Sequence, residues 1–171
     1  MRRNSLAALA VALIALTVVL VATLAACAPD PRIAVVQASI REYNVQLAKG
    51  YAQQDMNTLA PVATKQQAEI EYYLMASLGS GKLKMVSQLD SVEFGSIVFP
   101  GEAAAIARTS EVWDYQQIST ETSAVVRSEK GVTYHLEYRL VLSDGRWLVD
   151  SVKSTDPTSG AAPSGAASTT P

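Results

Sequence analysis

The segment from Val132 to Leu142 alternates apolar and polar side chains over its whole length. Successive side chains of an extended strand point to opposite faces, so one face of this segment is apolar and the other is polar. The apolar face carries Tyr134, Leu136, Tyr138, Leu140 and Leu142. The polar face carries Thr133, His135, Glu137 and Arg139. The pattern predicts a strand that packs one face against a core and leaves the other in solvent.

The segments before and after this strand in the sequence are also rich in residues that favour β-structure. The predicted strands are residues 84–92, 94–99, 103–115 and 146–152. Gly95 predicts a bend or bulge, and Pro100-Gly101 predicts a turn. Glu129-Lys130-Gly131 predicts another turn, and Ser143-Asp144-Gly145 is a hairpin signal.

The residues before Lys82 follow a helical period instead. Asp30 is predicted to cap a helix that begins at Pro31, and apolar residues then recur every three or four positions as far as Leu47. A short helix is predicted after Asp55, and a third is predicted after a capping box at Thr64 and Gln67. Its buried face is predicted to carry Ile70, Tyr73, Leu74 and Leu78. Three helices followed by an antiparallel sheet make an α+β order.

The first 26 residues have a different character. Arg2 and Arg3 form a positive start, and an apolar stretch leads to Leu24-Ala25-Ala26-Cys27, which contains the only cysteine of the chain. A positive start, an apolar stretch and small residues before a break are typical of a secretory signal. An uncleaved membrane helix is the alternative, since the stretch is long enough to span a bilayer. Both interpretations leave the rest of the chain outside the cytoplasm.

Leu24-Ala25-Ala26-Cys27 resembles the lipobox of bacterial lipoproteins. In that family the cysteine receives a lipid after cleavage just before it, so the resemblance implies a signal peptide at residues 1–26 and palmitate-type acylation at Cys27. Two or more acyl chains hold a protein firmly at a membrane. We therefore expect a lipid anchor at the extracytoplasmic face of the cell membrane, with residues 27–31 as a short linker.

Charge and composition restrict the partners of the mature chain. Without Arg2 and Arg3 it has 12 basic and 16 acidic residues, a net charge of −4, and no basic run. This distribution disfavours nucleic acid as a partner. Residues 155–171 are almost entirely Ser, Thr, Pro, Gly and Ala, a composition that predicts a disordered tail.

The order of elements over residues 32–154 resembles the nuclear transport factor 2-like superfamily, in which helices close a strongly curved antiparallel sheet into a cone. Glu111-x-Trp113-x-Tyr115 and the segments 134–140 and 144–149 look most like the plastid-division, intermembrane-space-like branch. The resemblance implies three N-terminal helices on a curved sheet. It implies little about function, because this fold serves enzymes and binding modules alike.

Four residues are candidates for lining the interior of such a cone: Glu111, Trp113, Tyr134 and Tyr138. Strand parity places Glu111 with Trp113, although an ion pair with Arg108 or Arg139, or a simply solvated carboxylate, is the simpler expectation. His135 lies on the polar strand face and is expected to point outward, too far from a substrate to act as a base. We predict no catalytic residue, no metal site and no cofactor.

These observations favour a non-catalytic, membrane-anchored module that binds an envelope protein or a small hydrophobic ligand. A small enzyme or a ligand carrier that uses the cone is the first alternative. A structural subunit of an envelope or division complex is the second, and it rests on the resemblance alone. The polar strand face argues against a large obligate interface, so a monomer or a weak dimer is expected.

Overall fold

The computed structural model describes residues 30–156. The chain divides after Ile33 into two units, residues 1–33 and 34–171, of which Asp30–Ile33 and Ala34–Asp156 are described. The signal peptide predicted at residues 1–26, the lipidation site Cys27 and nearly all of the predicted tail lie outside the described residues. Within residues 30–156, no helix is long and apolar enough to cross a membrane.

Within residues 30–156 the helical part contains two α-helices and one short 3-10 helix. They are α2 (Pro31–Gln53), η1 (Met56–Leu59) and α3 (Lys65–Ser80). Their starts follow the predicted caps: Asp30 accepts a hydrogen bond from the backbone N–H of Arg32, and Thr64 accepts one from that of Gln67. The prediction of three N-terminal helices is wrong for the middle one, because Asp55 and Pro61 leave room for only a single 3-10 turn.

The buried face of α3 differs from the predicted one. Ile70 is largely exposed and Tyr73 is 70% exposed. The buried positions of this helix are Gln67, Glu71, Met75 and Leu78. The prediction is confirmed for Leu78, which is buried, and Leu74 packs partly buried against the core. It is wrong for Ile70 and Tyr73, because the helix turns Gln67 and Glu71 inward instead.

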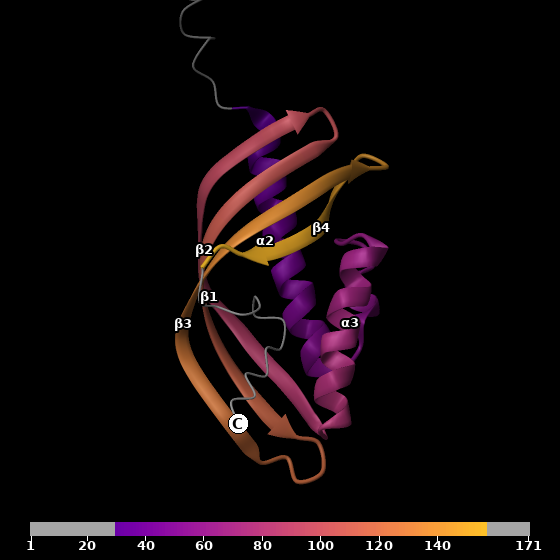
Figure 1. Ribbon diagram of the computed structural model, residues 1–171, viewed down its shortest axis with the longest axis vertical. Coiled ribbons are helices and arrows are strands. Elements are labelled where there is room, and N and C mark those ends of the chain that lie inside the picture. The colour runs from indigo at the N-terminus through magenta and orange to yellow at the C-terminus, as the bar shows by residue number, and fades with distance from the viewer. Residues whose placement is uncertain (1–29, 157–171) are drawn as a thin grey trace, which may run out of the picture. The chain divides into compact units, whose positions relative to one another are not determined.

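The second half of the chain forms one four-stranded antiparallel sheet. Its strands are β1 (Leu83–Gly101), β2 (Ala104–Ser119), β3 (Val125–Ser143) and β4 (Arg146–Ser154), and they lie in the order β1-β2-β3-β4. The long strands bend strongly, and α2 and α3 lie on the same side of the sheet (Figure 1). The α+β class and the curved antiparallel sheet are therefore confirmed.

Two turn signals had different outcomes. The hairpin at Asp144-Gly145 is confirmed, with positive φ angles of 49° and 74° at these residues and Arg146 paired to Ser143. The turn predicted at 129–131 is wrong, because β3 runs through these residues with a bulge. Gly131 has φ +64°, a conformation that glycine adopts without strain. The β2–β3 connection lies instead between Ser119 and Val125.

The core lies between the helices and the sheet. On α2 it includes Val36, Ile40, Tyr43 and Leu47, as the helical period predicted. On β3 it includes Leu136, Tyr138 and Leu140 from the predicted apolar face, whereas Leu142 is exposed. Full burial of each large aliphatic side chain contributes roughly 1.5–3 kcal/mol. This packing brings the polar side chains of α2, α3 and β2 into the interior.

Candidate functional site

Glu111 is fully buried at the centre of the sheet. Its Oε1 accepts hydrogen bonds from Asn44 Nδ2 at 3.1 Å, Thr109 Oγ1 at 3.0 Å and the Tyr138 hydroxyl at 2.8 Å. Its Oε2 accepts one from Trp113 Nε1 at 2.9 Å. Four donors of the protein therefore converge on this carboxylate, three on Oε1 and one on Oε2.

Three structural elements supply these donors. Glu111 and Trp113 are two residues apart on β2, and strand parity places them on the same face. Tyr138 reaches them from β3, and Asn44 reaches them from α2. The Tyr138 hydroxyl also lies 3.1 Å from Asn44 Oδ1. The cluster therefore joins the first helix to the middle of the sheet.

A second buried carboxylate, Glu71, lies on α3. Its Oε1 accepts hydrogen bonds from the Tyr43 hydroxyl at 3.1 Å and Gln67 Nε2 at 2.9 Å, and its Oε2 accepts one from the Tyr51 hydroxyl at 2.9 Å. Burial raises the pKa of Glu71 above its ordinary value, although the three hydrogen bonds act in the opposite direction. This cluster joins α2 to α3.

The two clusters meet at Tyr43 and Tyr138. The ring centroids lie 6.2 Å apart in an edge-to-face arrangement with an interplanar angle of 82°. Burial raises the pKa of both hydroxyls well above the ordinary value, and the neighbouring carboxylates Glu71 and Glu111 add to the effect. Within residues 30–156, no buried side-chain nitrogen or oxygen lacks a hydrogen-bond partner.

The four predicted lining residues separate into two groups. Glu111, Trp113 and Tyr138 lie together in the buried cluster, in direct hydrogen-bond contact. Tyr134 is only partly buried, and its pKa is raised first by burial and then by the negative charge of Glu129.

The expected ion pair of Glu111 with an arginine is wrong. Arg108 and Arg139 both pair with Glu137 on the opposite face, at 3.5 Å and 3.3 Å. His135 is exposed, as predicted from strand parity.

Sequence reasoning missed Asn44, Tyr51, Gln67 and Glu71. Gln67 and Glu71 are four residues apart, which places them on one face of a helix, and their neighbours Met75 and Leu78 continue that face. This spacing was the available signal, but the apolar Ile70 and Tyr73 pointed to the other face.

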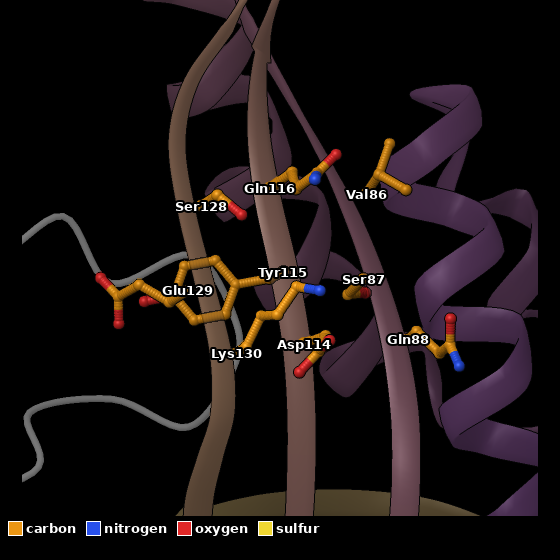
Figure 2. Close-up of a pocket in the computed structure, with 9 residues that line it drawn as sticks. All are labelled: Val86, Ser87, Gln88, Asp114, Tyr115, Gln116, Ser128, Glu129 and Lys130. Atoms are coloured by element: carbon orange, nitrogen blue, oxygen red, sulfur yellow. The ribbon is translucent and has the colours of Figure 1, made fainter.

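A shallow hollow of about 250 Å³ opens on the sheet and spans β1, β2 and β3 (Figure 2). Its lining residues are Val86, Ser87, Gln88, Asp114, Tyr115, Gln116, Ser128, Glu129 and Lys130. Asp114 Oδ1 accepts a hydrogen bond from the Gly131 N–H at 2.8 Å, which holds the β3 bulge beside the hollow. The hollow presents amide, hydroxyl and charged groups beside the apolar surfaces of Val86 and Tyr115.

Tyr115 is the aromatic member of this hollow. Burial and a hydrogen bond to Glu129 raise the pKa of Tyr115 to about 12. The Arg127 guanidinium lies 5.9 Å from the centre of the Tyr115 ring and also pairs with Glu129. These contacts order the side chains at the border of the hollow. In the described part of the chain, no group of three His, Cys, Asp or Glu side chains is arranged to hold a metal ion.

No family model matches the sequence, and no curated protein matches it significantly. Solved structures do share the fold. The intermembrane space region of the chloroplast protein ARC6 superposes with a TM-score of 0.60 at 14% identity, over 74% of this chain and 97% of that one. A ketosteroid isomerase-like protein from Erwinia carotovora atroseptica superposes with a TM-score of 0.50 at 13% identity, over 75% of this chain and all of that one. These similarities support the nuclear transport factor 2-like fold predicted from the sequence.

Proposed function

We propose that this chain is a lipid-anchored extracytoplasmic protein that binds a partner through its surface and performs no chemistry in its interior. The observation that carries the proposal is that the two buried carboxylates are hydrogen-bonded to other side chains of the protein. Glu111 accepts four hydrogen bonds and Glu71 accepts three, all from side chains of the same domain.

A catalytic carboxylate needs a different environment. A general base has to reach the proton of its substrate within about 2.6–3.2 Å, directly or through one water. A substrate that approached Glu111 would have to displace Trp113 or Tyr138, both of which are almost fully buried. The polar centre therefore serves the fold in this proposal, and recognition takes place outside it.

The anchor rests on the sequence before Asp30. The leader ends in Leu24-Ala25-Ala26-Cys27, the arrangement typical of a lipid acceptor in bacterial lipoproteins. The fold neighbour ARC6 supports an extracytoplasmic role, since the part of that protein that matches is an intermembrane space region.

We place the binding surface at the hollow in Figure 2, which combines amide groups with charges of both signs. Gln88 and Gln116 offer amide groups, and Asp114 and Lys130 offer charges of both signs. Such a mixture suits a polar segment of an envelope protein better than a small hydrophobic ligand, because an apolar ligand would leave these groups without partners. We therefore favour a protein partner.

The anchor is tested by Cys27→Ser. We expect the variant to remain an unprocessed precursor that takes up no labelled fatty acid, whereas the parent chain is labelled and shortened. Labelling of the variant at the parent level would show that Cys27 is not the acceptor.

The binding surface is tested with a photo-crosslinking side chain at Gln88 in native membranes. A matched chain carries the same group at Val98, an exposed position on the same strand that does not line the hollow. We expect one adduct of defined mass from position 88, abolished by Gln116→Arg, and no such adduct from position 98. Equal adducts from both positions, or a small molecule retained stoichiometrically in native mass spectrometry, would contradict the proposal.

A further inference from the structure

The free edge of β3 borders the hollow in Figure 2 and shares Ser128, Glu129 and Lys130 with its lining. β4 pairs with β3 only from Leu136 to Ser143, and Thr155 extends this pairing by one hydrogen bond to His135 (Figure 1). Residues 125–134 pair with β2 on one side, and no strand in residues 30–156 pairs with them on the other. Edges of this kind are templates for pairing with another strand.

We propose that residues 127–129 of β3, the regular stretch between two β-bulges, pair with the same residues of a second copy of this chain, antiparallel, around a two-fold axis at Ser128. Antiparallel pairing of one segment with itself places residues opposite each other when they are equally far from the axis. Arg127 then faces Glu129 of the second copy, and Glu129 faces Arg127 of the second copy.

The charge order of the segment supports this register. Arg127 and Glu129 are two residues apart, so their side chains project from the same face of the strand. In the paired sheet, each Arg127 lies opposite Glu129 of the second copy and next to Glu129 of its own strand. Opposite charges directly across a strand pair stabilise the pairing, whereas like charges destabilise it. Of the alternative axes, one at Arg127 or Glu129 would place two identical charges opposite each other.

The regular part of the β3 edge limits the contact. The β-bulges at Val126 and at residues 130–131 leave Arg127, Ser128 and Glu129 as the regular stretch, and Ser128 lies opposite itself. The small hydroxyl side chain at the axis leaves room for a close approach of the two strands.

The side chains that would form the contact are already ordered in the single chain. Arg127 Nε donates to Glu129 Oε1 at 2.7 Å, and its guanidinium lies over Tyr115 of β2. Ordering before association lowers the entropic cost of the contact. The regular contact involves only about three residues of each copy, which is small for a stable complex, so association is expected to be weak. The proposal rests on the strand edge and its charges and not on the identity of a partner at the hollow in Figure 2, although Ser128 and Glu129 belong to both.

The register is tested by disulfide formation in the full chain in membranes. Directly opposite residues of an antiparallel pair have Cα atoms about 4.5–5.5 Å apart, within the range that a disulfide spans. We expect Ser128→Cys to give a covalent dimer under mild oxidation. Lys130→Cys is the matched control. In the proposed register, the cysteine at position 130 of one copy lies four residues along the strand from that of the other copy, or about 13 Å away, too far for a disulfide. The parent chain, whose only cysteine is Cys27, sets the background.

Charge reversal tests the pairing of the charges. In the Ser128→Cys chain, Arg127→Glu or Glu129→Arg alone is expected to reduce the dimer roughly tenfold, because each creates two like-charge pairs. The double reversal restores opposite charges across the interface and is expected to restore the dimer. These residues are exposed or partly exposed, and circular dichroism would verify that each variant folds. A dimer no stronger for Ser128→Cys than for Lys130→Cys, or no recovery in the double reversal, would overturn the proposal.

Discussion

Tyr51→Phe is expected to destabilise the protein through Glu71. The substitution removes a single hydroxyl from a side chain that is only 1% exposed, and it leaves the ring in place. That hydroxyl is 2.9 Å from Glu71 Oε2, whereas the other two donors, Tyr43 and Gln67, both bond to Oε1. Without Tyr51 the second carboxylate oxygen loses its donor in a buried environment.

The size of the effect depends on the charge of Glu71. Hydrogen bonds to charged groups contribute about 1.5–3 kcal/mol, and those between neutral groups contribute about 0.5–1.5 kcal/mol. We therefore expect the free energy of unfolding to fall by about 1.5–3 kcal/mol where Glu71 is ionised. The loss is expected to be smaller at acid pH, where the carboxyl group of Glu71 is protonated.

The pH dependence has a definite sign. The pKa of Glu71 is raised in the folded protein, mainly by burial, so the folded state binds a proton more tightly than the unfolded state. This contribution to stability is fully present below the unfolded pKa and is lost as the pH rises through the folded pKa. The Tyr51 hydrogen bond lowers the folded pKa. Removing it therefore raises that pKa further and extends the pH range over which stability is lost.

Urea denaturation of the purified chain across a pH series measures these effects. Tyr73→Phe is the matched control, because Tyr73 is on α3 like Glu71 but is largely exposed, and its loss is expected to stay within about 0.5 kcal/mol. Equal losses for the two variants at every pH would refute the role of the hydrogen bond. A loss for Tyr51→Phe that grew toward acid pH would refute the assignment of the effect to ionised Glu71.

Two further predictions concern the packing of the same domain. Glu111→Ala leaves three buried donors, on Asn44, Thr109 and Trp113, without their acceptor and is expected to lower the free energy of unfolding by about 3–5 kcal/mol. Glu137→Ala, which breaks surface ion pairs, should cost about 1 kcal/mol or less. Gly50→Ala places a Cβ 2.8 Å from Thr58 Oγ1 and is expected to lower the free energy of unfolding by about 1–3 kcal/mol, measured by thermal or urea unfolding. Gly79→Ala is the control: its Cβ lies 3.6 Å from the nearest atom, Gln54 Nε2, and the variant should stabilise α3 by about 0.5–1 kcal/mol. Equal effects within either pair would contradict the contacts described.

Local signals predicted the parts of the fold that depend on neighbouring residues. The alternation from Val132 to Leu142 identified the central strand and its buried face, because the period of a strand is visible in the sequence itself. The hairpin at Asp144-Gly145 and the caps at Asp30 and Thr64 were also predicted, since each involves residues a few positions apart.

Signals that depend on distant residues were misleading. Gly131 resembles a turn glycine, and only the pairing of β3 with β2 shows that it lies in a bulge. Hydropathy placed Ile70 and Tyr73 inside, but α3 buries Glu71, whose donors Tyr43 and Tyr51 lie 28 and 20 residues earlier. Burial of a carboxylate is favourable only when such donors converge on it, and their convergence cannot be derived from one helix.

The two buried carboxylates also explain how α2 is positioned. Glu111 binds α2 through Asn44, and Glu71 binds the same helix through Tyr43 and Tyr51. Apolar packing is not directional and would tolerate a helix that slid or rotated slightly, whereas these hydrogen bonds are lost within about 1 Å of movement. A shift of α2 would leave both carboxylates buried without donors, which is costly. The hydrogen bonds of Glu111 and Glu71 thus fix one placement of α2 against α3 and the sheet. The sheet that carries the surface hollow and the β3 edge is held rigidly as a result.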